Sequence, residues 1–160
     1  MIIFLNASIN SGKSTIAKML ANSIPNVALV EIDALRSMID WMPIDKAIPI
    51  NLQNTVSLIK NFTSHDINVI VPYPLSEQNY DYMMSELKDI DTKIYTFTLS
   101  PKLDKVITNR GNRELNNSEV ERIKYHYDIG IHNPSFGKII DNTEQTSEEI
   151  AKIILSKINK

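Results

Sequence analysis

The stretch from Ala7 to Thr15 constrains this chain more than any other part of the sequence. It reads Ala-Ser-Ile-Asn-Ser-Gly-Lys-Ser-Thr and lies between an apolar run at 2–5, which predicts a buried strand, and a run with helical spacing of apolar residues. It matches the pattern G-x-x-x-x-G-K-S/T, except that Ala7 stands at the first glycine position. A loop of this kind turns its N–H groups inward, and the following helix adds the positive end of its dipole. We expect a phosphate-binding loop; the alternative is a helix N-terminus with an incidental Gly-Lys-Ser.

Each residue type in the loop has a chemical reason to be there. Lys13 is expected to reach the β- and γ-phosphates of a nucleotide, and the Ser14 hydroxyl is expected to ligate Mg²⁺. Ala7 introduces a Cβ where glycine is usual, which costs about 1 kcal/mol if the loop needs a positive φ there. The residues expected to bind the nucleotide are Asn10, Ser11, Gly12, Lys13, Ser14 and Thr15.

Length and composition limit the classes of protein to which this chain can belong. The 160 residues suit a single domain over 1–160, and the net charge of −2 provides no positive field for nucleic acid or anionic membrane. There is no cysteine, so disulfides, thiolate metal sites and a cysteine nucleophile are excluded. No apolar stretch is long enough to span a bilayer, and the start lacks a secretory leader. We therefore expect a cytoplasmic protein with no membrane partner.

Strands and helices alternate along the chain. The expected strands cover 2–5, 27–32, 68–71, 93–99 and 138–141, and the expected helices cover 14–23, 33–42, 52–63, 79–87, 101–108, 118–129 and 147–158. Because most strands are apolar on both faces, they predict an α/β fold in which helices cover both sides of a parallel sheet. In such folds ligands bind at the carboxyl ends of the strands.

Asp33 and Arg36 lie just after the second expected strand. Asp33 could accept the proton of an attacking hydroxyl or hold Mg²⁺ through water. Arg36, one turn further on, could bind an anionic group of an acceptor or pair with Asp33. The alternative is an N-cap aspartate with a solvated arginine. Beside a phosphate loop we favour the functional interpretation.

A second basic cluster follows the fourth strand. Only four arginines are present, and Arg110, Arg113 and Arg122 are three of them. Arg110 and Arg113 flank Gly111, so a segment over 109–129 is expected to act as a lid that brings positive charge to a transferring phosphoryl group. The alternative is a solvated, charged surface.

Aromatic residues near the same edge complete the candidate site. Trp41 and Tyr73 are expected to line an acceptor pocket, although core packing or loop stiffening is the commoner role of such residues. The histidines at 65, 126 and 132 show no spacing that suits a metal, and His126 is expected to have a packing or surface role.

Residues 4–15 resemble the opening of small P-loop kinases of the chloramphenicol phosphotransferase-like group, and the order of the remaining parts looks like the nucleoside-monophosphate-kinase fold. The resemblance implies a three-layer αβα domain with five parallel strands in the order 2-3-1-4-5, ATP as phosphoryl donor and a hydroxyl acceptor. By position it implies that Lys13 and Ser14 hold phosphate and Mg²⁺, that Asp33 is the catalytic base and that Arg110 and Arg113 belong to the lid. It also places Asn142 and Thr143 near the adenine.

Three functions remain to be compared. The leading interpretation is an ATP- and Mg²⁺-dependent kinase that phosphorylates a hydroxyl of a small molecule. A polynucleotide 5′-hydroxyl kinase would share Asp33 and Arg36, but the net charge and the lack of a basic stripe make nucleic acid an unfavoured partner. A non-catalytic nucleotide-binding module is suggested by Ala7 and by the absence of an acid at the end of the third strand. The sequence does not indicate the acceptor or the oligomeric state.

Overall fold

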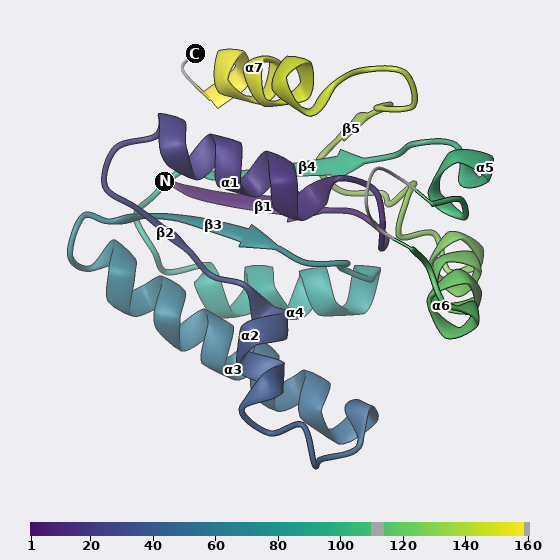
Figure 1. Ribbon diagram of the computed structural model, residues 1–160. Coiled ribbons are helices and arrows are strands. Elements are labelled where there is room, and N and C mark those ends of the chain that lie inside the picture. Colours follow the sequence, from purple (N-terminus) through teal and green to yellow (C-terminus); the bar gives the residue numbers. More distant parts are fainter. Residues whose placement is uncertain (110–113, 159–160) are drawn as a thin grey trace.

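A computed structural model describes residues 1–109 and 114–158 of the chain. These residues form one five-stranded sheet in the order β2-β3-β1-β4-β5, with every neighbouring pair parallel (Figure 1). Both the α/β fold and the strand order that the resemblance implies are thereby confirmed. The strands are β1 (Ile2–Asn6), β2 (Val27–Leu29), β3 (Asn68–Pro72), β4 (Ile94–Leu99) and β5 (Lys138–Ile140).

Helices cover the sheet on both faces because the strands are apolar on both faces. In β1, Ile3 and Leu5 pack towards α1 (Lys13–Ser23) and α7 (Ser147–Ile158), whereas Ile2 and Phe4 pack towards α3 (Ile44–Thr63) and α4 (Glu77–Leu87). This alternation follows from the two-residue period of a strand. The result is a three-layer αβα domain with a separate apolar core on each side of the sheet (Figure 1).

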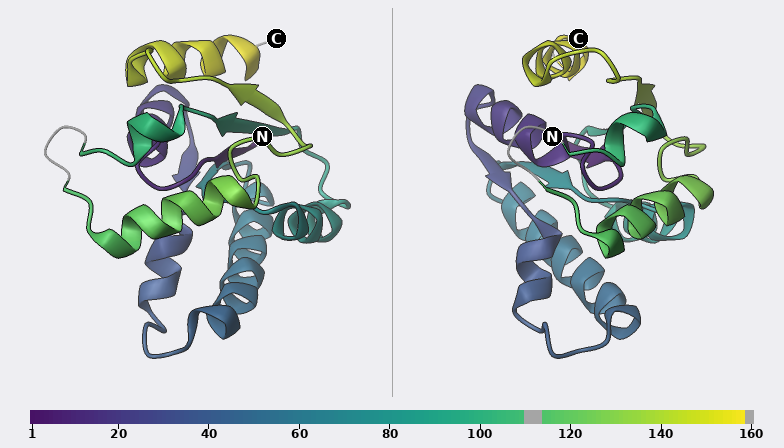
Figure 2. Two further views of the ribbon diagram at one scale, coloured as in Figure 1. Left: turned by 90° about the vertical axis from the view of Figure 1, so that its right-hand side faces the viewer. Right: turned by 45° about the vertical axis from the view of Figure 1, so that its right-hand side comes forward.

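The remaining helices lie towards the carboxyl ends of the strands. These are α2 (Ile32–Ser37), α5 (Leu103–Val106) and α6 (Asn117–Asp128). Figure 2 shows α6 on one side of this end and the α2–α3 pair projecting on another. The start of α6 is held by a capping box, in which Asn116 bonds the N–H of Glu119 and the Glu119 carboxylate bonds the N–H of Asn116. None of the described helices combines the length and the apolar character that crossing a bilayer requires.

The predicted helix over 33–42 is wrong beyond Ser37. The Arg36 guanidinium donates to the backbone carbonyls of Ile39 (2.5 Å), Asp40 (3.2 Å) and Met42 (2.7 Å), so the chain turns back around this side chain. The preceding strand is also shorter than predicted, since β2 ends at Leu29. Similarly, the helix predicted over 101–108 is reduced to the four residues of α5.

The helix predicted over 52–63 begins earlier than predicted, because α3 starts at Ile44 and contains Pro49. Pro43 occupies the N-cap position, where the absence of a backbone N–H removes no helical hydrogen bond. Pro49 removes one bond, to the carbonyl of Asp45, which lies in the exposed first turn. The remaining buried face of α3 is long enough to keep the helix continuous.

Two glycines with positive φ provide a matched test of the packing at β5. Gly137 (φ 71°) lies directly before β5, and a Cβ there would be 2.7 Å from the backbone oxygen of Thr96 and 2.9 Å from its Cβ. Gly130 (φ 79°) has no heavy atom within 4 Å of the same position. We expect Gly130→Ala to cost about 1 kcal/mol from backbone strain alone, and Gly137→Ala to cost about 3 kcal/mol because the clash adds to the strain. Urea unfolding of the two variants measures the difference, and equal losses would contradict the close approach of Gly137 to β4.

Candidate active site

The loop between β1 and α1 makes its turn at two residues suited to a left-handed backbone. Asn10 has φ 61° and Gly12, the N-cap of α1, has φ 82°. Asparagine and glycine are the residues that adopt this region most readily. Ala7 is fully buried in the core and does not have a positive φ, so the cost considered for its Cβ does not arise. The missing first glycine is therefore compatible with the loop.

Hydrogen bonds to three other segments hold this loop in place. The Asn10 amide donates to the carbonyls of Val106 and Thr108, both at 2.9 Å. Asn142, which follows β5, donates to the carbonyl of Ser11 at 3.0 Å. The hydroxyl of Ser8 is 3.1 Å from Nδ1 of His126 on α6. The loop is therefore positioned before any ligand binds.

A hollow of about 400 Å³, here called the loop pocket, opens in front of this loop. The start of α1 faces it without a side-chain cap and without an acidic residue in the first turn. The N–H groups and the positive dipole end at the start of such a helix suit an anion. The lining residues are Ser8, Ile9, Asn10, Ser11, Gly12, Lys13, Ser14, Thr15, Asp33 and Ser147.

A larger cavity of about 610 Å³, here called the side pocket, adjoins the loop pocket. The two share Ile9, Lys13 and Asp33, so one ammonium group and one carboxylate lie where the pockets meet. The walls of the side pocket come mainly from α2, α3, the segment after β3, and α6. The two pockets thus leave room for a separate ligand on either side of Lys13 and Asp33.

Tyr73 lies in the side pocket within electrostatic reach of Asp33 and Arg122, which also line it. Burial raises the pKa of Tyr73, the Asp33 carboxylate raises that pKa further, and the Arg122 guanidinium opposes the shift. Tyr73 therefore keeps its phenolic proton near neutral pH and can donate a hydrogen bond. Tyr73 was predicted to line the acceptor pocket, and it lines the side pocket.

His126 is a site residue that the sequence analysis missed. It lines the side pocket, is buried, and contacts the Ser8 hydroxyl of the phosphate loop. Burial, and after it the positive charges of Arg122 and Lys13, together lower its pKa to about 4. The imidazole is therefore neutral near pH 7. Its spacing of four residues from Arg122 on one helix was the sequence signal, since residues i and i+4 share a helix face.

The remaining predicted acceptor and lid residues do not all lie at the pockets. Arg36 lines the side pocket, but its two terminal nitrogens bond to backbone carbonyls, and no ion pair with Asp33 is found among the described residues. Trp41 is 75% exposed and lines neither pocket. Arg110 and Arg113, predicted as lid residues, lie outside the described residues.

Of the two residues expected near an adenine, Asn142 contacts the loop and Thr143 contacts residues outside it. Asn142 is buried and holds Ser11, as described above. The Thr143 hydroxyl donates to Asp141 (2.5 Å) and accepts from the N–H of Lys102 (3.0 Å), which joins the segments after β4 and β5. Neither side chain lines the loop pocket, whereas Ser147 at the start of α7 does. Ser147 was missed, although it follows a strand at the same sheet edge.

Oxygen donors suited to Mg²⁺ lie together at the loop pocket. The Ser14 hydroxyl and the Asp33 carboxylate both line it, and hard oxygen ligands with phosphate oxygens are what Mg²⁺ prefers. Among the described residues no group of three His, Asp or Glu side chains forms a protein-only metal cage. This donor set fits a cation that arrives with a phosphate ligand.

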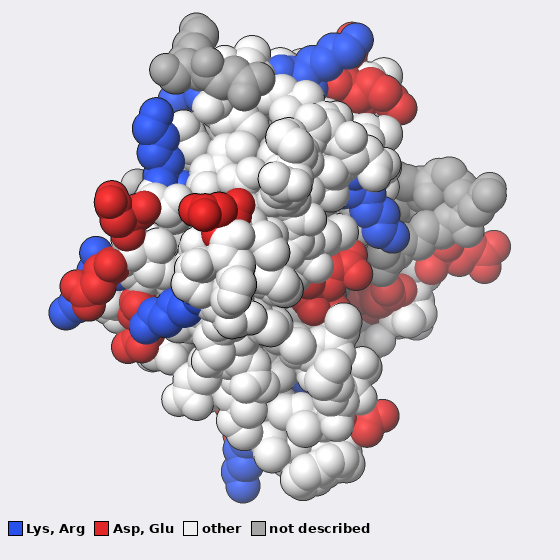
Figure 3. All heavy atoms as spheres, turned by 90° about the vertical axis from the view of Figure 1, so that its left-hand side faces the viewer, with Lys and Arg blue, Asp and Glu red and all other residues white. Residues whose placement is uncertain are grey.

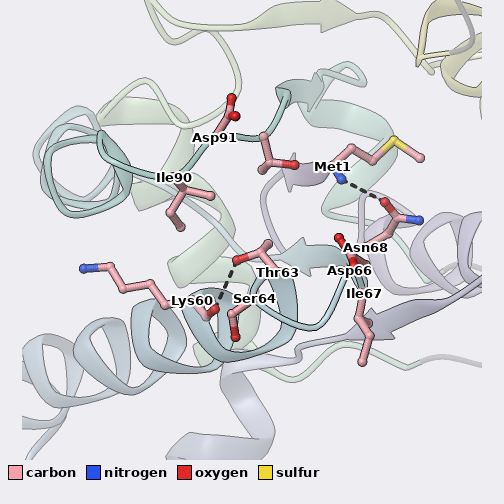
Figure 4. A pocket seen from close by; sticks show the side chains of 10 residues that line it. Met1, Lys60, Thr63, Ser64, Asp66, Ile67, Asn68, Ile90 and Asp91 are labelled. Carbon is pink, nitrogen blue, oxygen red and sulfur yellow. Dashed lines mark hydrogen bonds between the residues drawn. The ribbon is translucent and has the colours of Figure 1, made fainter.

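A third hollow, of about 540 Å³, lies at the opposite end of the sheet (Figure 4). There the Met1 ammonium donates to Oδ1 of Asn68 at 2.8 Å, and Lys60, Asp66 and Asp91 add charges of both signs. None of the predicted site residues lines it.

Comparison with known proteins shows the fold but no close relative. No protein-family model matches this chain, and no curated protein matches it. Among solved structures it is similar to the tunicamycin resistance protein of Deinococcus radiodurans, with 22% identity, a TM-score of 0.64, and coverage of 98% of this chain and 94% of that one. It is also similar to a sugar kinase from Janibacter, with 15% identity, a TM-score of 0.72, and coverage of 99% and 94%. A gluconokinase from Sinorhizobium meliloti has 16% identity and a TM-score of 0.70, with coverage of 98% and 90%. The chain thus has the P-loop kinase fold over its whole length.

The depressed pKa of His126 predicts how stability depends on pH. Below pH 6.5 the unfolded chain binds a proton at this residue, whereas the folded chain does so only near pH 4. The free energy of unfolding is therefore highest above pH 6.5 and decreases as the pH falls from 6.5 towards 4. Between pH 7 and pH 4.5 the decrease is about 2–3 kcal/mol. Urea unfolding at both pH values should show a smaller loss for His126→Gln than for the unmodified chain. His65→Gln, at an exposed site, controls for the substitution itself. An unchanged pH dependence in His126→Gln would contradict the burial of a neutral imidazole.

Proposed function

We propose that this protein is an ATP- and Mg²⁺-dependent phosphotransferase that moves the γ-phosphoryl group to a hydroxyl of a small molecule. The observation that carries the proposal is the position of Lys13 and Asp33 where the loop pocket meets the side pocket. Phosphoryl transfer needs a cation at the transferring group and a proton acceptor at the attacking hydroxyl, and these must meet at one point.

The loop pocket is the donor side in this proposal. The N–H groups at the start of α1 and the Lys13 ammonium bind the phosphate tail, and Ser14 and Asp33 are the residues that would hold Mg²⁺, Asp33 through water. The bound cation neutralises charge that develops on the phosphate oxygens. Asn142 and Thr143 remain the predicted residues near the adenine. Arg110 and Arg113 are proposed to supply further positive charge as lid residues.

The side pocket is the acceptor side. Asp33 accepts the proton of the acceptor hydroxyl as its oxygen attacks phosphorus, and the bond from phosphorus to the bridging oxygen breaks on the opposite side. Tyr73, which lies within electrostatic reach of both Asp33 and Arg122, orients the acceptor together with Arg122. Water is excluded by the apolar part of the lining, to which Ile9, Ile32, Ile48 and Ile131 contribute.

The two other functions considered receive less support. A cavity of about 610 Å³ has the size of a small-molecule site rather than of a nucleic-acid channel. The net charge of the chain is −2, and on the face at the amino ends of the strands, shown in Figure 3, positive and negative side chains are interspersed rather than arranged in a basic stripe. A non-catalytic module would have no need of a carboxylate shared between two pockets.

Lys13 is the most direct target for a test. Lys13→Ala should lower kcat/KM for phosphoryl transfer by about 100-fold or more, because a charge directed at the transferring group is lost. Lys18→Ala, an exposed lysine on the same helix, is the matched control and should leave the rate unchanged. The measurement is ADP release from Mg·ATP, stimulated by members of a panel of hydroxyl compounds.

Asp33→Asn separates transfer from binding alone. If Lys13→Ala keeps the full stimulated rate, the proposed function is wrong. If the unmodified chain binds ATP but no acceptor stimulates ADP release, and Asp33→Asn changes nothing, the non-catalytic module is the better description.

A further inference from the structure

The two ring nitrogens of His126 serve different surroundings. Nδ1 is 3.1 Å from the hydroxyl of Ser8 in the phosphate loop. Within residues 1–109 and 114–158, Nε2 has no hydrogen-bond partner, and it is not one of the polar atoms there that are both fully buried and unpartnered. Nε2 therefore keeps accessible surface. Because the ring lines the side pocket and not the loop pocket, this nitrogen opens towards the acceptor side.

The contact with Ser8 indicates which nitrogen carries the proton of the neutral ring. Ser8 is only 1% exposed, and Nδ1 is the one hydrogen-bond partner of its hydroxyl among the described residues. If Nδ1–H donated to this hydroxyl, the buried hydroxyl proton would lack an acceptor, which costs free energy. The hydroxyl therefore donates to Nδ1, and the proton of the ring lies on Nε2.

The neighbours of the ring indicate what Nε2–H can bind. Burial, and after it the charges of Arg122 and Lys13, lower the pKa of His126 to about 4, so the ring is a neutral donor near pH 7. Lys13, Arg122 and the phenolic hydroxyl of Tyr73 line the same pocket and also donate hydrogen bonds. Oxygen atoms with lone pairs fit such a group of donors, whereas an ammonium group beside Lys13 and Arg122 is repelled.

The oxygen bound by Nε2–H is not the one that is phosphorylated. In the proposed function the attacking hydroxyl gives its proton to Asp33 and a lone pair to phosphorus. A hydrogen bond from Nε2–H to the same oxygen would compete for its lone pairs and slow the attack. The partner of Nε2–H is therefore a second oxygen of the acceptor.

We propose that His126 is a specificity-determining residue whose Nε2–H donates a hydrogen bond to an oxygen of the acceptor other than the attacking one. The acceptor is then a compound with at least two oxygen groups, a polyol or a hydroxy acid. The inference rests on the proposed function, since that function assigns the side pocket to the acceptor. It adds the residue that selects the acceptor and the group that it selects.

The first test needs no knowledge of the acceptor. Long-range ¹H–¹⁵N NMR of the imidazole rings at about pH 7.5, where the His126 ring is neutral, shows which nitrogen is protonated. We expect Nε2–H with an unprotonated Nδ1 at His126. His65, whose Nδ1 is 2.8 Å from the carbonyl of Asn61, is an internal reference for the opposite tautomer. An Nδ1–H tautomer at His126 overturns the proposal.

The second test uses two substitutions that each preserve one of the two nitrogen positions. Asparagine places its amide where Nδ1 lies and can keep the bond to Ser8, whereas glutamine places its amide nitrogen where Nε2 lies. The assay is ADP release from Mg·ATP with glycerol, glucose, gluconate and uridine as probes. For any probe turned over, His126→Asn should raise the KM of the probe about 5- to 10-fold, with kcat and the KM of ATP changed by less than about 2-fold. His126→Gln should raise the KM of the probe by less than about 3-fold.

The opposite order has a different meaning. If His126→Gln raises the KM of the probe or of ATP and His126→Asn does not, the imidazole serves the phosphate loop alone, and the proposal is wrong. His65→Asn, at an exposed site, is the matched control for the substitution itself.

These outcomes separate the inference from the function on which it rests. If transfer occurs and depends on Lys13 but His126→Asn leaves every KM unchanged, the proposed function stands and the role of His126 is wrong. If no compound stimulates ADP release, the proposed function fails. In that case the NMR experiment still decides whether His126 presents a donor to the side pocket, and an Nδ1–H tautomer overturns the inference independently.

Discussion

The site depends on one turn of backbone, where the chain leaves β1 and enters α1. The turn places left-handed φ values at Asn10 and Gly12, which tolerate them, and leaves the first N–H groups of α1 without a side-chain cap. A loop like this keeps its shape without a ligand only if other segments hold it. Asn10, Asn142 and the contact between Ser8 and His126 do so from three directions. An anion can then bind without the loop having to be ordered at the same time, which lowers the entropy cost of binding.

The electrostatics of the site follow from this arrangement. Lys13 and Arg122 both lie near His126, so a third positive charge there would repel them. Burial and these two neighbours lower the pKa of His126 to about 4, and the imidazole therefore links the phosphate loop to α6 as a neutral group. Asp33 is the acid that both pockets share. The charge available for chemistry is thus concentrated where the two pockets meet.

The features of the fold and the site that could be predicted are those determined by residues close together in the sequence. The loop and the strands were predictable because they are encoded by local pattern, namely Gly-Lys-Ser after an apolar run and β1 apolar on both faces. The strand order was implied by the resemblance, not by periodicity. The helix at Pro49 and the turn at Arg36 were missed because side-chain-to-backbone bonds and buried surface outweigh local propensity. His126 and Ser147 were missed because their positions depend on contacts between segments distant in sequence.

We propose that the turn between β1 and α1 binds the phosphates of ATP. The decisive experiment is backbone amide NMR of the ¹⁵N-labelled protein, titrated with Mg·ADP. We expect the largest shifts on Ser11, Gly12, Lys13 and Ser14, and weaker binding in Lys13→Ala. Shifts that cluster instead around Met1, Asn68 and Thr92 at the other end of the sheet, or no shifts at all, would contradict it.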